Sequence, residues 1–341
     1  MSARRLVVAA LATVVTALIA YTLYWNHGAG QARKALQDWA ESKRGQGWTV
    51  GWSEIAVGGF PFRLTLTLTA PSLTSPAGFH WDGPRLDASV VPLWPRHLRL
   101  STSGTQYLGW PGGERGITVT HATANVGHAD LEAHVHDLRD LRDSGFAIAD
   151  MALSLAALPG ASGEPPGGRN EPAPAWRFAL SAQTLELGAP LRPGLGQTIA
   201  LAEISGRIVG AFDDAPPLAA LANWSKRGGT IELERVALDW PPLGLEGDGT
   251  AALDPDGQPL AALSTRVIGL PALMDRLAQS GTIDVGSAQT AKTMLSLMAK
   301  PDPRGRAAIA TPLTIQDGWL YLGPARLVAV PAIAWADFPH P

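Results

Sequence analysis

The chain has 341 residues, of which 46% are hydrophobic and 17% charged, and it contains 37 glycines and 28 prolines. This composition predicts many short strands separated by turns rather than a helical bundle. The net charge of -3 and the lack of a long basic run argue against nucleic acid as a partner. The chain has no cysteine, which excludes disulfides, thiolate metal sites and thiol nucleophiles but leaves the cellular compartment open.

The strongest single signal is an uncharged stretch over residues 6–25 that follows two arginines. Its length is close to the roughly twenty residues that cross a bilayer as a helix. Tyr21, Tyr24 and Trp25 at its far end suit the headgroup zone, and the arginines hold the near end in the cytoplasm. Residues 1–26 are therefore predicted to form a cytoplasmic tip and a transmembrane anchor, with the body of the protein on the other side of the membrane.

A cleaved signal peptide is the alternative to a retained anchor. Gly30 and Ala32, on either side of Gln31, are small residues at a spacing that signal peptidase tolerates. Signal peptides usually have an apolar region of only about 7 to 15 residues, however, which favours the anchor.

Residues 30–44 are expected to form an amphipathic helix that links the membrane segment to the body. Ala32, Leu36, Trp39 and Ala40 fall at helical spacing, and charged residues occupy the rest of the helix. The apolar stripe could lie on lipid, but packing against a sheet is the ordinary interpretation.

From residue 48 onward, apolar residues alternate with polar ones, as they do in strands. In the clearest case, Leu64, Leu66 and Leu68 alternate with threonines, which predicts a half-buried antiparallel strand over residues 63–69. Further strands are expected over residues 86–91, 97–101, 117–126, 129–136, 146–155, 176–182, 184–187, 199–209, 230–240, 249–253, 260–267, 307–315 and 319–330. The apolar residues change phase within residues 230–240, which predicts a β-bulge.

Residues 158–175 consist mainly of Pro, Gly, Ala, Glu and Ser, and we expect a flexible loop there because such a segment buries too little to offset its ordering entropy. This loop divides the β-rich body into an N-terminal part, residues 48–157, and a C-terminal part, residues 176–341. Short helices are expected over residues 216–225, 271–279 and 287–299.

The predicted fold is mainly β: a large curved antiparallel sheet, shaped like a groove or a taco and arranged as one body or two lobes, with few helices besides the transmembrane one. So little helix cannot cover both faces of a long sheet. The apolar strand faces must therefore either pack on each other or line a groove that holds a ligand. The candidate groove residues are Leu64, Leu66, Leu68, Val236, Leu238 and Trp240.

The sequence contains no nucleophile elbow, Walker loop, zinc-protease motif or dinucleotide-binding glycine pattern, so we predict no enzyme activity, catalytic residue or cofactor. His128, His134 and His136 are weak metal candidates, since imidazoles two residues apart on a strand can share an ion. The last two alternate with apolar residues and most simply face solvent, so no metal site is predicted. Asp254 and Asp256 resemble the start of a calcium loop without its closing glutamate, which favours an ordinary turn.

Residues 52–64 resemble a known family signature. They contain Gly59, Phe60, Pro61, Phe62 and Arg63, which match the G-[FY]-P-F-R signature of the DUF2125 family of bacterial envelope proteins, found mostly in alphaproteobacteria. The resemblance extends over nearly the whole chain through residues 228–233, 238–240, 245–254 and 312–323. The glycine turns of the second half are also similar, more distantly, to the C-terminal part of AsmA-like proteins.

The resemblance implies a single-pass protein of the bacterial inner membrane, with its N-terminus in the cytoplasm and its body in the periplasm. The similarity to AsmA-like proteins implies that this body binds or transfers phospholipid or another envelope lipid through an apolar groove. The alternative is a non-enzymatic structural or regulatory envelope protein with a closed, dry core. A hydrolase ranks last because no paired carboxylates stand out. The sequence identifies neither the lipid, nor the direction of transport, nor a protein partner.

Overall fold

The structure, a computed structural model, describes residues 3–92, 97–111, 113–142, 145–158, 174–188, 195–213, 217–302 and 305–333, with the side chains of the first helix described from Thr13 onward. The contacts divide the chain into two units, Met1–His128 and Ala129–Pro341. All described strand pairings are antiparallel, which confirms the predicted mainly β fold.

The elements of each unit are as follows in chain order. The first unit contains α1 (Ala3–Gly45), β1 (Thr49–Gly51), β2 (Glu54–Gly58), β3 (Leu64–Thr69), β4 (Ser72–Thr74), β5 (His80–Asp82), β6 (Arg85–Val90), β7 (Leu98–Trp110) and β8 (Gly113–Val126). The second contains β9 (Asp130–Asp140), β10 (Ala147–Ala157), β11 (Pro174–Glu186), β12 (Thr198–Val209), α2 (Pro217–Lys226), β13 (Thr230–Trp240), β14 (Leu243–Leu253), β15 (Pro259–Ile268), α3 (Leu270–Gln279), α4 (Val285–Met298), β16 (Lys300–Pro301), β17 (Ala307–Gln316), β18 (Trp319–Leu322) and β19 (Ala325–Ala329).

α1 is one unbroken helix, so the predicted membrane segment and linker helix are not separate elements. No proline interrupts the helix, and Gly28 and Gly30 face open space, where an isolated glycine costs only about 1 kcal/mol relative to alanine. Across the described part of the chain, no helix is both long enough and apolar enough to cross a membrane.

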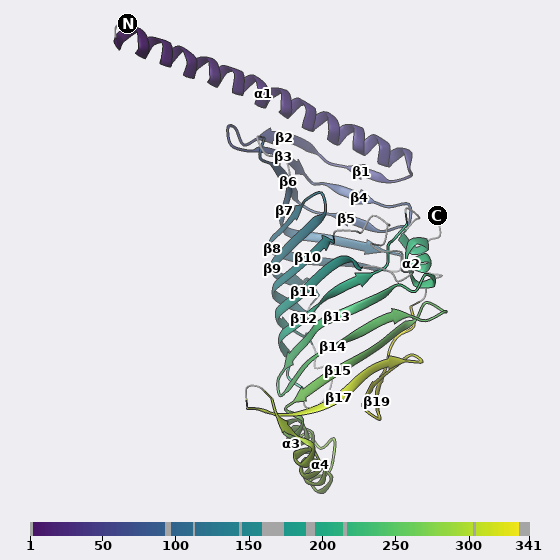
Figure 1. Ribbon diagram of the computed structural model, residues 1–341. Coiled ribbons are helices and arrows are strands. Elements are labelled where there is room, and N and C mark those ends of the chain that lie inside the picture. The colour runs from purple at the N-terminus through teal and green to yellow at the C-terminus, as the bar shows by residue number, and fades with distance from the viewer. Residues whose placement is uncertain are drawn as a thin grey trace, which may run out of the picture. The chain divides into compact units, whose positions relative to one another are not determined.

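The second half of α1 packs against β1, β2 and β3 (Figure 1). Trp25 and Ala40 are buried in this contact, and Leu36 is half-buried on the same stripe of the helix. Packing on the sheet is therefore confirmed for this segment. Trp39, which we had assigned to the same stripe, is 44% exposed and points away.

The sheet of the first unit forks at β7. β8 pairs along one edge of β7, while β6 pairs with the first half of the other edge and β5 with the second half. One branch continues from β6 to β3 and β2, and the other from β5 to β4 and β1. β4 and β5 escaped prediction because each is only three residues long.

A buried glutamine lies close to the fork. Gln106 is 4% exposed, and its amide nitrogen donates to the Thr102 hydroxyl (3.0 Å) and the Ser103 carbonyl (3.2 Å). Its amide oxygen accepts a hydrogen bond from the Trp81 indole on β5 (3.2 Å). The buried amide is thus satisfied on both sides, which ties the second branch to β7.

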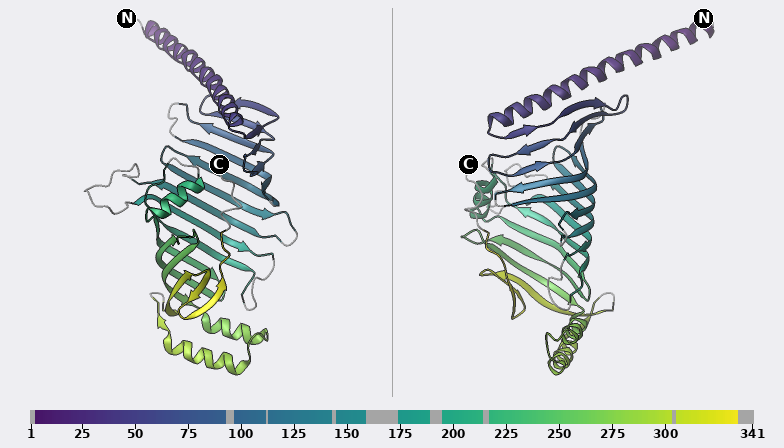
Figure 2. Two further views of the ribbon diagram at one scale, coloured as in Figure 1. Left: turned by 90° about the vertical axis from the view of Figure 1, so that its right-hand side faces the viewer. Right: turned by 180° about the vertical axis from the view of Figure 1, so that it is seen from behind.

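The second unit is a meander in which each strand pairs with its neighbour in sequence from β9 to β15, and then from β17 to β19 (Figure 1). The sheet twists along its length, and α3 and α4 form a hairpin beyond β17 (Figure 2). β10 and β11 pair along their whole lengths. Both strands that flank the predicted loop therefore belong to the second unit, and the division between the units follows His128. Residues 159–173, the main part of that loop, lie outside the described residues.

Several strands differ from the predicted ranges, and the two strands predicted over residues 176–182 and 184–187 are the single strand β11. β7 continues to Trp110 and β14 begins at Leu243, since glycines within both strands interrupt the apolar pattern that we used to find them. The range 319–330 splits into β18 and β19 around Gly323, which has φ 56. The predicted bulge is confirmed: the pairing of β13 shifts register at Glu234 and Arg235 against both neighbouring strands.

Trp224 fixes α2 to the end of the sheet. Its side chain is 2% exposed, its indole nitrogen donates to the Val209 carbonyl at 2.8 Å, and its ring stacks on Phe212 with 5.7 Å between centroids. A Cβ at Gly229 would lie only 2.3 Å from the Trp224 ring. The tryptophan therefore needs a glycine opposite it.

We expect Trp224→Ala to lower the free energy of unfolding of the second unit by about 3 to 5 kcal/mol, because it empties a packed site and leaves the Val209 carbonyl without its donor. Trp39→Ala is the matched control, and its exposed ring predicts a change within about 0.5 kcal/mol. Urea unfolding of the full chain measures both values. Equal effects of the two substitutions would contradict the anchoring role of Trp224.

Candidate functional site

The pairing register of the second unit determines which side chains share a face, because directly paired residues on neighbouring strands point to the same side of a sheet. Three adjacent rows on one side are almost entirely apolar. The first is Leu131, Leu155, Phe178, Gly206, Leu233, Gly249, Leu263, Leu313 and Leu322. The second is Ala133, Leu153, Leu180, Ile204, Val236, Gly247, Thr265 and Thr311, and the third is Val135, Met151, Ala182, Ala202, Leu238, Leu245, Val267 and Ile309. We call this side the apolar face.

The opposite side of the same strands carries the charges. One of its rows is His134, Ala152, Ser181, Glu203, Ala237, Glu246, Arg266 and Ala310. Arg235 donates to Glu203 at 2.9 Å, and this hydrogen bond, together with the charge of Glu203, raises the pKa of Arg235. Arg207 pairs with Glu232 at 3.3 Å. Partly exposed pairs of this kind suit a solvated surface, so the charged side is the one that faces water.

The apolar face is open over β10 and β11. Leu153 and Leu180 are paired directly in the middle of the three rows and are 36% and 38% exposed. Toward β15 and β17 the same face is covered, with Val267 and Ile309 at 4% and 6% exposure. In the described part of the chain, Trp224 at 2% exposure is the most buried large side chain, whereas close-packed cores contain several that are fully buried.

The described helices leave this opening uncovered. α2 lies at the strand ends, where Trp224 bonds to the end of β12 and the Ser225 hydroxyl donates to Leu253 at the end of β14 (3.5 Å). α3 packs on α4, which contacts the sheet at β17. Neither α2 nor this hairpin packs against β10 or β11 in the described structure.

The structure separates the six predicted groove residues into two groups. Val236, Leu238 and Trp240 lie on the apolar face and are half-buried, as the alternation had predicted. The Trp240 indole also donates to the Gly196 carbonyl at 2.7 Å, which fixes its orientation.

Leu64, Leu66 and Leu68 belong to the first unit and share one face of β3. Leu66 and Leu68 are only 8% and 6% exposed, and α1 packs against their strand. The prediction that these two leucines line an open groove is therefore wrong, since protein already covers them. Leu64 is half-buried.

Sequence reasoning missed the residues at the opening, above all Leu153, Phe178 and Leu180. Their strands were predicted over residues 146–155 and 176–182, but none of the three was among the candidate groove residues. The missing information was the pairing of β10 with β11, which brings Leu153 against Leu180. A periodic pattern gives a side chain's face but not its partner across the sheet.

The three histidine candidates do not form a metal site. His134 and His136 alternate on the exposed side of β9, and the His136 ring forms a hydrogen bond with the Asp150 carboxylate of β10. His128 lies in the turn before that strand and is also exposed. In the part of the chain that the structure describes, no group of three or more His, Asp or Glu side chains is placed to bind a metal ion.

One constellation without a sequence signature involves Thr74, His80 and Asp82. His80 Nδ1 lies 2.7 Å from the Thr74 hydroxyl, and its Nε2 lies 2.7 Å from Asp82. The order hydroxyl, imidazole, carboxylate is that of a catalytic triad. The His80 and Asp82 side chains are 35% and 38% exposed on a strand surface, however, and a triad needs a site that excludes water. We interpret these contacts as a hydrogen bond between β4 and β5 and a hydrogen bond within β5.

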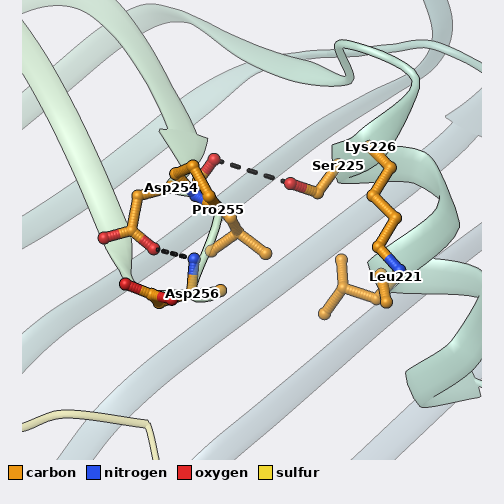
Figure 3. A pocket seen from close by; sticks show the side chains of 9 residues that line it. Leu221, Ser225, Lys226, Asp254, Pro255 and Asp256 are labelled. Carbon is orange, nitrogen blue, oxygen red and sulfur yellow. Dashed lines mark hydrogen bonds between the residues drawn. The ribbon is translucent and has the colours of Figure 1, made fainter.

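A hollow of about 580 Å³ lies between α2 and the turn after β14 (Figure 3). Leu221, Ser225 and Lys226 line it from the helix, and Asp254 and Asp256 from the turn. The Asp254 carboxylate accepts hydrogen bonds from the backbone nitrogens of Asp256 (2.9 Å) and Gln258 (2.7 Å). The acidic group therefore holds its own turn together, as an ordinary turn predicts.

The turn between β2 and β3, which contains the family signature, is docked on α1. The Tyr21 hydroxyl donates to the Pro61 carbonyl, and the Trp25 indole donates to the Arg63 carbonyl at 3.0 Å. The Phe60 ring lies 6.2 Å from the Tyr21 ring and 5.6 Å from the Trp25 ring, edge-on to the latter. Two hydrogen bonds and two ring contacts thus join the signature turn to the helix.

Gly59 begins this turn in a conformation that other residues avoid. Its φ is 93, and a Cβ at this position would lie 2.7 Å from the Arg63 carbonyl oxygen. Its neighbour Gly58 has no atom within 4 Å of the same position. The first glycine of the signature pair is therefore replaceable and the second is not.

We expect Gly59→Ala to destabilise the first unit by at least about 1 to 2 kcal/mol, the cost of a left-handed backbone, and by more if the turn must shift. Gly58→Ala should change the stability by less than about 0.5 kcal/mol apart from any propensity gain. Thermal unfolding of the two variants measures the difference. Similar losses for both would show that the positive φ isn't the constraint.

The comparisons with known proteins agree with the sequence signature. The model of a family described as "Uncharacterized protein conserved in bacteria (DUF2125)" matches residues 25–331. No curated protein and no solved structure matches the chain. The more distant similarity to AsmA-like proteins therefore stays a hypothesis.

Proposed function

The chain belongs to the DUF2125 family, and we propose that it is an inner-membrane-anchored periplasmic protein that binds or transfers lipid on the apolar face of its second unit. The exposure of Leu153 and Leu180, which lie in the middle of the three apolar rows, carries this proposal. The occupant is a phospholipid or another envelope lipid with long acyl chains. The role is that of a binding protein and not of an enzyme.

The size of the face supports an acyl chain as the occupant. The longest row crosses nine strands, which at about 4.8 Å per strand gives roughly 38 Å. Three rows, two residues apart, add about 14 Å in the other direction. Covering half of this area is worth about 7 kcal/mol at about 25 cal/mol per Å², which is comparable to the net stability of a whole domain.

The membrane anchor rests on the first helix. Residues 6–25 carry no charge, and the described residues 13–20 are exposed all around the helix. An uncharged helical segment that is exposed on every side is suited to lipid. Tyr21, Tyr24 and Trp25 follow directly, and aromatic residues of this kind mark the bilayer interface.

A structural or regulatory envelope protein with a closed, dry core is the second candidate. The coverage of Val267 and Ile309 on the same face favours it over that part of the sheet. Over β10 and β11 the closed core is less suitable, because none of the described helices α2, α3 and α4 packs against these strands.

The two candidates predict different results for Leu180→Gln. On an open face, this change should abolish photo-crosslinking of a diazirine-labelled phospholipid to β10 and β11 in the full chain. It should cost less than about 1 kcal/mol of stability, as at a surface site. Leu66→Gln, in the covered first unit, should cost about 1 to 3 kcal/mol for the buried amide and more for lost packing.

Ser154→Gln is the matched control, since Ser154 is exposed on the charged side of β10, next to Leu153. It should leave both the crosslinking and the stability unchanged. Crosslinks that map only to α1 would reject the binding face and favour the structural candidate. A large loss of stability in Leu180→Gln would do the same.

A further inference from the structure

The signature turn and the exposed part of α1 adjoin each other. Residues 13–20 of the helix are exposed on all sides, and contacts with the body begin at Tyr21, which is followed by Tyr24 and Trp25. Tyr21 and Trp25 bind the turn of residues 59–63 and not a strand. The turn therefore meets the helix where its exposed section, residues 13–20, ends.

The contacts hold this turn beside Tyr21 and Trp25, two of the aromatic residues predicted to lie at the bilayer interface. Phe60 packs against both Tyr21 and Trp25, and Trp25 is only 9% exposed. The Tyr24 hydroxyl donates to the Pro92 carbonyl at 3.0 Å, which ties a second turn to the same section of the helix. The depth of the turn in any membrane is thus set by the helix, because the two are bonded at several points.

The side chains that the turn presents outward are apolar. Phe62 is 82% exposed and Phe60 is 51% exposed, and the exposed Arg63 follows them. An exposed aromatic pair beside an arginine suits the headgroup zone, where rings meet the acyl boundary and a guanidinium meets phosphate.

We infer that the turn of residues 59–63 is a second membrane-interface anchor, which inserts Phe60 and Phe62 into the headgroup zone of the leaflet from which α1 emerges. This inference rests on the membrane anchor of the proposed function but not on lipid binding by the apolar face. The turn is proposed to bind the bilayer surface. The helix contacts argue for that choice, because they place the turn beside Tyr21 and Trp25.

The absence of cysteine makes the depth of single residues measurable. The full chain carrying Phe62→Cys is labelled with bimane and reconstituted into vesicles of phosphatidylethanolamine and phosphatidylglycerol. Phe62 is the position of choice because its exposed ring makes none of the contacts that hold Phe60. Lipids with a nitroxide at a shallow or a deep acyl carbon then report the depth of the label by quenching.

Leu18→Cys and Phe79→Cys are the reference positions. Leu18 is 60% exposed and lies in the exposed section of α1, residues 13–20. Phe79 is 44% exposed in the turn between β4 and β5, whose Pro76 lies against Gly47 just past the end of α1. The helix rises about 30 Å from Trp25 to Gly45, so the two turns lie at opposite ends of its packed section.

The Phe62 label should be quenched most by the shallow nitroxide, several-fold more than the Phe79 label, with its emission shifted to shorter wavelength. The Leu18 label should be quenched most by the deep nitroxide. Quenching at Phe62 no greater than at Phe79, with Leu18 still deep, would overturn the second anchor and leave the helix anchor intact. That result is also expected if the turn binds another protein. An unquenched Leu18 label would overturn the helix anchor itself, and with it the depth assigned to the turn.

Discussion

The register of antiparallel pairing is the constraint on which the second unit depends. A slip of one residue between two strands would turn every following side chain to the other face, so an apolar face across nine strands requires each pair to stay in step. The bulge at Glu234 and Arg235 shows how this is achieved. Leu233 and Val236 differ in parity along the chain, and the extra residue returns Val236, Leu238 and Trp240 to the apolar side.

Glycines on the two neighbouring strands allow those strands to approach β13 closely beside the bulge. Gly206 and Gly249 both pair with Leu233, and a Cβ at either would lie close to a neighbouring carbonyl oxygen, 2.0 Å from that of Glu232 and 2.2 Å from that of Ala262. The Gly-Asp-Gly segment in which Gly249 lies is therefore a requirement of close strand approach and not a sign of catalysis.

The two units treat an apolar sheet face in different ways. In the first, α1 packs across β1, β2 and β3, and Leu66 and Leu68 become interior. In the second, the described helices lie at the strand ends or beyond β17, and Leu153 and Leu180 stay open. The strands of both units carry the same alternation of apolar and polar residues, so alternation predicted the strands and their faces but not which face is covered. Coverage depends on elements far away in the sequence. The unbroken α1 was missed for a related reason: its two halves differ in chemistry, and only the lack of a breaking residue marks them as one helix.

The neighbour-to-neighbour pairing of the second unit also makes its length adjustable. Each strand from β9 to β15 bonds only to the strands before and after it in the meander, so one more hairpin could be added without breaking any other pairing. Such a hairpin would lengthen the apolar face by about 10 Å, two strand spacings, while α1 and the signature turn stayed as they are. In this architecture the reach of the sheet and its attachment can evolve independently, as in proteins built from tandem repeats.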